Sequence, residues 1–104
     1  MPEKDFEILI NEITRIFVYI HTDTGKLENF VIKLEYFYNG RWREVQRYDC
    51  EHGSVHKDIL NRGGKKIRTV FYRLIDKKGG LDMAVQDFRD NYEVYVWRFF
   101  NESK

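Results

Sequence analysis

An alternating segment followed by Asn39-Gly40 constrains the fold of this chain most strongly. Between residues 30 and 38, apolar side chains at every second position are separated by Lys33 and Glu35. This period of two is typical of a strand with one buried face. Asn-Gly is a strong signal for a two-residue hairpin turn, because both residues tolerate a positive φ. The sequence therefore predicts a hairpin whose second strand runs from Trp42 to Tyr48.

The register of this hairpin has two solutions in the sequence. A two-residue turn places Glu35 opposite Glu44, and like charges directly opposite each other are unfavourable. A bulge removes that contact and shifts the pairing by one residue. Arg41, Arg43 and Arg47 fall on alternate positions, so they share one face of the strand unless a bulge intervenes.

The remaining segments predict further strands and one helix. Residues 13–20 and 66–74 are rich in β-branched and aromatic side chains and predict strands, whereas 6–10 fits a short helix or a strand. Residues 55–60 predict a further strand, with His56 and Asp58 on one face and Lys57 on the other. After an expected loop at 77–80, apolar residues recur at helical spacing from Leu81 to Phe99. We expect an α+β fold: an antiparallel sheet of four to five strands with a C-terminal helix packed on one face.

Size and composition set the broad class of protein. A chain of 104 residues is expected to form a single domain over residues 1–104. The formal net charge of +1 gives no global signal for binding polyanions. The single cysteine excludes an internal disulfide and suits a reducing compartment. With no apolar run of membrane-spanning length and no signal-peptide pattern, we expect a cytoplasmic protein that does not enter a membrane.

A polar segment at residues 47–58 is the candidate functional site, since it contains two of the three histidines and the only cysteine. His52 and His56 can act as general base and general acid near neutral pH. On RNA, one histidine would deprotonate the 2′-hydroxyl and the other would protonate the leaving oxygen. Asp49 or Asp58 would orient an imidazole.

Three further residues complete this predicted site. Arg47 or Lys57 would bind phosphate and stabilise charge on the phosphoryl group, and Tyr48 could stack on a base. Such a site needs no metal and no other cofactor. A thiol needs a nearby base to act as a nucleophile, and His52 lies two residues from Cys50. A buried small residue is nevertheless the better interpretation of Cys50.

Three alternatives remain open for the same segment. One histidine can cap a turn while the other pairs with Asp49 or Asp58, which is a purely structural role. Asp49, His52 and His56, with Asp58 or Cys50, can also ligate a metal ion. Third, the loop can be the recognition surface of a non-catalytic binding module for a protein or nucleic acid.

The ordered motifs resemble a small prokaryotic family of unknown function. The matching residues are Leu34-Glu35-Tyr36, Gly40-Arg41-Trp42, Arg47-Tyr48-Asp49, His52-Gly53 and His56-Lys57-Asp58, followed by a helix from Ala84 to Phe99. The RYDxxHGxxHxD motif is also distantly similar to TumE-type toxins of toxin–antitoxin pairs. That resemblance implies a toxin-like protein acting on RNA, with a metal-independent ribonuclease-like activity and an antitoxin-like protein partner. We also expect a homodimer through the C-terminal helix, where Trp97 falls outside the apolar stripe.

Overall fold

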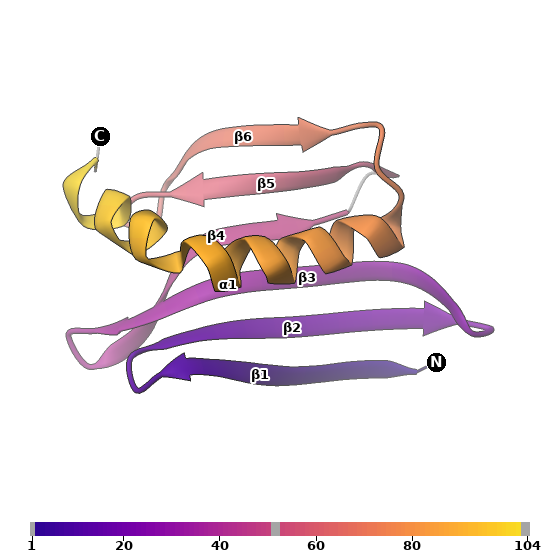
Figure 1. Ribbon diagram of the computed structural model, residues 1–104, viewed down its shortest axis with the longest axis horizontal. Coiled ribbons are helices and arrows are strands. Elements are labelled where there is room, and N and C mark those ends of the chain that lie inside the picture. Colours follow the sequence, from indigo (N-terminus) through magenta and orange to yellow (C-terminus); the bar gives the residue numbers. More distant parts are fainter. Residues whose placement is uncertain (1, 51–52, 103–104) are drawn as a thin grey trace.

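A computed structural model of the chain, which describes residues 2–50 and 53–102, contains a six-stranded antiparallel sheet and one helix. The strands lie in chain order, so each pairs with its neighbours in the sequence, and the helix crosses one face of the sheet (Figure 1). The elements are β1 (Glu3–Asn11), β2 (Thr14–Asp23), β3 (Lys26–Tyr38), β4 (Arg41–Asp49), β5 (Val55–Leu60), β6 (Lys66–Tyr72) and α1 (Lys77–Asn101). The α+β class and the packed C-terminal helix are confirmed.

The sheet has six strands, so the prediction of four to five was too low. The additional strand is β1, which contains the segment 6–10 that fitted either a helix or a strand. Its run of consecutive apolar residues has no clear period, and pairing with β2 along most of its length decides the conformation. Phe6 and Ile8 then lie with Leu81 and Val85 of α1 around one shallow depression.

The β3–β4 hairpin combines both registers considered from the sequence. Asn39 and Gly40 have φ angles of 50° and 80°, as a two-residue turn requires, and Glu35 does lie opposite Glu44. Their repulsion is offset, because Arg15 Nε lies 2.7 Å from Glu35 Oε1 and a second arginine, at position 47, lies 2.9 Å from Glu44. The bulge occurs further along, between the pairs formed by residues 34 and 35.

This bulge, at Val45, separates the three arginines of β4. Arg41 and Arg43 lie opposite tyrosines of β3 that contact Phe100 of α1, so they belong to the helix side of the sheet. Arg47 follows the extra residue and lies opposite a lysine on the other side. The sequence placed the three arginines on one face only in the absence of a bulge, and this bulge moves Arg47 to the face opposite Arg41 and Arg43.

The helix begins at Lys77, so the expected loop at 77–80 is its first turn. The side chain of Asp76 caps this end by accepting a hydrogen bond of 2.8 Å from the backbone N–H of Gly79. Gly80 lets the helix approach the sheet, because a Cβ atom there would lie 2.7 Å from Cγ2 of Val55. Two glycines that suggested a loop thus serve a cap and a close packing contact.

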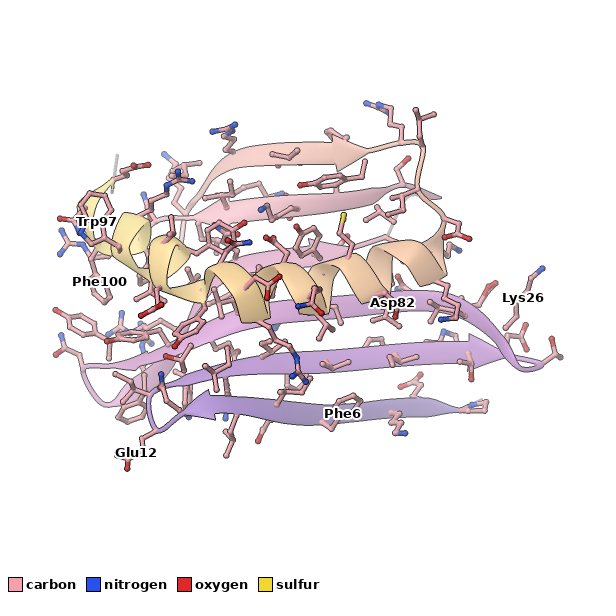
Figure 2. All side chains as sticks on the ribbon, in the orientation of Figure 1. Phe6, Glu12, Lys26, Asp82, Trp97 and Phe100 are labelled. Atoms are coloured by element: carbon pink, nitrogen blue, oxygen red, sulfur yellow. The ribbon has the colours of Figure 1, made fainter. Side chains whose placement is uncertain are left out.

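The hydrophobic core lies between α1 and the sheet. Its members come from β2, β3, β4, β5 and α1 and from Cys50 just after β4, and the fully enclosed ones include Ile16, Phe30, Ile32, Leu34, Ala84 and Phe88. Trp97 is 61% exposed, and Figure 2 shows it with Phe100 at the C-terminal end of α1. Over the described residues, α1 is too polar to be a membrane-spanning helix.

Candidate functional site

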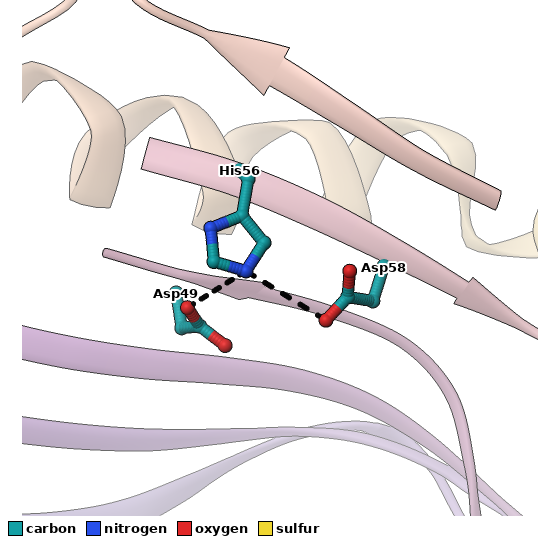
Figure 3. A group of neighbouring side chains, drawn as sticks. All are labelled: Asp49, His56 and Asp58. Carbon is teal, nitrogen blue, oxygen red and sulfur yellow. Dashed lines mark ion pairs between the residues drawn. The ribbon is translucent and has the colours of Figure 1, made fainter. Parts of the chain in front are cut away.

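Three polar side chains of β4 and β5 meet on the face of the sheet away from α1. Asp49 and His56 are directly opposite each other in the β4–β5 register, and Asp58 lies two residues beyond His56 on the same face. Figure 3 shows the three side chains on one side of the strands, with α1 behind them. Asp49 and Asp58 are only 6% and 3% exposed, so this carboxylate pair is held in a largely buried position.

The imidazole of His56 lies between the two carboxylates. Its Nε2 atom is 3.0 Å from Asp49 Oδ1 and 3.7 Å from Asp58 Oδ2. One ligand atom from each of the three residues lies within 4.8 Å of the others. On the other side of the ring, Nδ1 is 3.3 Å from the backbone carbonyl oxygen of Ser54, which can accept a hydrogen bond from an Nδ1–H group. In that tautomer the lone pair of Nε2 faces the carboxylates.

Strand β6 supplies further contacts to Asp58. The hydroxyl of Thr69 donates a hydrogen bond of 2.8 Å to Asp58 Oδ1, and Lys66 Nζ lies 3.5 Å from Oδ2. The side chain of Lys66 is 56% exposed, whereas that of Asp58 is 4% exposed. The carboxylate is therefore oriented by a fixed hydroxyl and only loosely neutralised by a solvated amine.

A depression beside this cluster is open to solvent. It is lined by Ser54, His56, Asp58, Lys66, Thr69, Phe71 and Arg73. Phe71 is 52% exposed; its ring centre lies 5.7 Å from that of His56, and the guanidinium of Arg73 lies 4.7 Å from the Phe71 ring. A ligand in the depression would therefore meet the imidazole, two cations and an aromatic surface.

The structure brings together Asp49, His56 and Asp58 from the predicted site. Arg47 lies on the same face, opposite Asp58 in the β4–β5 register. His52 lies outside the described residues, so its predicted role in acid–base catalysis stays a prediction.

Tyr48 and Lys57 lie on the opposite face, between the sheet and α1. Lys57 is only 7% exposed, and its Nζ atom is 3.4 Å from Oδ2 of Asp87 on the helix. The hydroxyl of Tyr48 donates a hydrogen bond of 2.6 Å to the same carboxylate oxygen. Because side chains alternate along a strand, the sheet separates both residues from His56. The predicted phosphate and base contacts of Lys57 and Tyr48 are thus not adjacent to the imidazole.

Asp87, which is not among the predicted site residues, is the centre of this second polar cluster. It also accepts hydrogen bonds of 2.7 Å from Tyr95 and from Asn91. Burial alone would raise the pKa of Asp87, but the tyrosine hydrogen bonds and the charge of Lys57 lower it overall. Burial, and then the hydrogen bond to Asp87, raises the pKa of both tyrosine hydroxyls. The spacing of residues 87, 91 and 95 along one helix face was the available signal.

Cys50 is buried, as its sequence context indicated. It is 3% exposed, and its thiol donates to Asn29 Oδ1 at 3.1 Å. Within residues 2–50 and 53–102, the group of converging metal-ligand atoms consists of Asp49, His56 and Asp58, without Cys50.

Comparison with known proteins gives a family. The family described as Domain of unknown function (DUF7718) matches residues 1–104. No curated protein and no solved structure matches the chain.

Proposed function

We propose that this chain, which belongs to the DUF7718 family, binds one divalent metal ion through Asp49, His56 and Asp58. The convergence of three ligand atoms within 4.8 Å carries the proposal. Around an ion with bonds of about 2.1 Å, neighbouring ligand atoms lie roughly 3.0 to 3.4 Å apart. The imidazole–carboxylate distances of 3.0 and 3.7 Å are close to these values before any ion binds. Small side-chain rotations would bring the carboxylates to the same spacing.

The surroundings of the cluster resemble the outer shell of a metal site. A metal-ligating histidine usually donates its other ring N–H to a carbonyl or carboxylate, and the Ser54 carbonyl is placed for that role. Ligating carboxylates are likewise held by hydrogen bonds, as Asp58 is held by Thr69. These contacts would fix the ligand atoms without occupying the space between them.

Charge and ligand type indicate the class of metal. Two carboxylates and a neutral imidazole carry a charge of about −2, which a divalent ion neutralises. A mixed nitrogen and oxygen set suits Zn²⁺, Mn²⁺, Fe²⁺ or Ni²⁺ better than the thiolate-preferring metals. With three protein ligands, coordination positions remain for water or a substrate, as in catalytic sites. The depression beside His56 would give a substrate access to them.

Calorimetric titration of the metal-free protein with Zn²⁺ and with Mn²⁺ tests the proposal. We expect one ion per chain for at least one metal, and affinity at least tenfold weaker in His56→Ala and Asp58→Asn. His21→Ala and Asp82→Asn are the matched controls, because both residues lie outside the cluster. Affinity should fall on acidification, since the metal and a proton compete for Nε2. Equal binding by wild type and His56→Ala would refute the site.

The depression supports a second candidate, which is the toxin-like action on RNA inferred from the sequence. Lys66 and Arg73 could contact phosphates, and the exposed ring of Phe71 could stack on a base beside His56. In this proposal His52 and His56 are the acid and base, Asp49 orients the His56 imidazole, and no metal takes part.

RNA cleavage assays separate the two candidates. Cleavage that continues in EDTA and is lost in both His52→Ala and His56→Ala would support the metal-independent ribonuclease. Cleavage abolished by EDTA and restored by one metal would support the metal centre. RNA capture without turnover would support the binding module. The antitoxin-like partner and the homodimer through α1 are separate proposals, and sedimentation of wild type and Trp97→Glu tests the homodimer.

A further inference from the structure

A second cavity lies on the helix side of the sheet, near the C-terminal end of α1. Its volume is about 110 Å³. Its apolar walls are Val45, Ile59, Leu60, Ile67 and Phe99. Ile59 follows Asp58 in β5, so the two side chains point to opposite faces of the sheet. The cavity is therefore separate from the Asp49–His56–Asp58 cluster.

Gln46 lines this cavity and has an unsatisfied polar atom in its side chain. The residue is 2% exposed and lies between Leu34 of β3 and Ile59 of β5 in the sheet register. Its Oε1 atom is buried and has no hydrogen-bond partner among the described residues. Buried polar groups in native proteins are nearly always paired, because an unpaired one destabilises the fold. Tyr95 also lines the cavity, and its hydroxyl already donates a hydrogen bond to Asp87.

The entrance of the cavity has an excess of positive charge. Arg68, on β6, and Arg98, on α1, line it together with one acid, Glu102. The pair between Arg98 and Glu102 is long, at 3.9 Å, and both side chains are more than half exposed. Within the described parts of the chain, Arg68 forms no ion pair. Two guanidinium groups opposed by one carboxylate favour an anion, and guanidinium matches a carboxylate in shape.

From these features we propose that the cavity binds a small aromatic carboxylate that carries a hydroxyl group. An apolar cavity of about 150 Å³ holds benzene, so this smaller one holds most of a single ring and leaves one substituent at the entrance. The ring would contact Ile59 and Phe99, the hydroxyl would bond to the Gln46 amide, and the carboxylate would face Arg68 and Arg98. A hydroxyl both donates and accepts, so it suits either orientation of the amide.

Titration with 4-hydroxybenzoate tests the proposal, with phenol and benzoate as matched probes. Each of these probes lacks one of the two polar groups, so each should bind at least about tenfold more weakly than 4-hydroxybenzoate. Amide resonances of residues around Ile59 and Phe99 should shift in the NMR spectrum. His56→Ala should bind the probe as wild type does, because it alters the other face of the sheet.

Two variants assign the polar contacts. Gln46→Met keeps the length of the side chain and should bind 4-hydroxybenzoate and benzoate equally. Arg68→Gln should weaken the binding of both carboxylate probes, 4-hydroxybenzoate and benzoate, about tenfold and leave the affinity for phenol unchanged. Because Arg68 is exposed, its variant reports on the site even if Gln46→Met fails to fold. The proposal is overturned if 4-hydroxybenzoate causes no shifts around the cavity, or if its affinity is unchanged in Arg68→Gln.

Discussion

Substitution of Asp87 by asparagine should destabilise the protein strongly. The carboxylate lies between the sheet and α1, where it accepts hydrogen bonds from Tyr48, Tyr95 and Asn91 and pairs with Lys57. The side chains of Asp87 and Lys57 are only 16% and 9% exposed. The variant would leave the Lys57 ammonium buried without a counter-charge.

The size of the effect follows from the loss of one partner of a buried ion pair while the other charge remains. Removal of one partner of a buried ion pair costs about 3 to 5 kcal/mol, and partial exposure places Asp87→Asn near the lower end. At roughly 4 to 8 °C per kcal/mol, the melting temperature should fall by at least about 12 °C. Lys57→Met should cost less, because Asp87 keeps three hydrogen-bond donors. The double variant should cost less than the sum of the two, since it leaves neither charge unpaired.

Urea denaturation at neutral and acidic pH measures the loss of stability in each of these variants. The pKa of Asp87 is lowered below its ordinary value of 3.8 in the folded protein, so its ionised form stabilises the fold above that pH. This stabilisation is lost as the pH falls through the lowered folded pKa, and the difference between wild type and Asp87→Asn should shrink there. Asp82→Asn, at an exposed site on the same helix, is the control and should change stability by less than about 0.5 kcal/mol. A loss below about 1 kcal/mol in Asp87→Asn, or additive single variants, would refute the reasoning.

Three further substitutions test the packing and capping of α1 and the cavity. Gly80→Ala should destabilise the protein by about 1 to 3 kcal/mol in urea denaturation, because the new Cβ atom would clash with Val55. Adding Val55→Ala in a double variant should restore part of that lost stability. Asp76→Ala should lose about 1 kcal/mol through the missing helix cap, and an unchanged unfolding midpoint would show that the bond to Gly79 contributes nothing. Gln46→Met should be neutral or stabilise the ligand-free protein by about 1 kcal/mol, since it removes an unsatisfied buried oxygen; a large loss of stability would mean that the amide is already satisfied.

Strand alternation and turn chemistry were sufficient to predict the central hairpin. The Asn39-Gly40 turn and the alternating β3 segment depend on residues that are close together in the sequence, so they can be predicted without knowledge of the tertiary packing. The bulge at Val45 has no such signature, because valine is compatible with either face of a strand. Its consequence, that Arg47 leaves the face of Arg41 and Arg43, could not be read from spacing alone.

The candidate site was predictable only in part for a similar reason. Alternation along β5 separates His56 and Asp58 from Lys57 once the segment is known to be a strand. The proximity of Asp49 to His56 also depends on the β4–β5 register, which spacing within one segment does not determine. The partner of Lys57 is 30 residues away on α1, so only the packing of the helix identifies Asp87.

The strand order has a consequence for how the chain reaches its folded state. Each strand hydrogen-bonds only to its neighbour in the sequence, so the sheet can grow by closing short loops one after another, each at a low entropic cost. Packing of α1 on β3 instead joins segments about fifty residues apart along the chain. We therefore expect docking of the helix, and not strand pairing, to limit the folding rate. Until then the apolar face of the nascent sheet is open to water, which makes this interval the one in which the chain is most prone to aggregate.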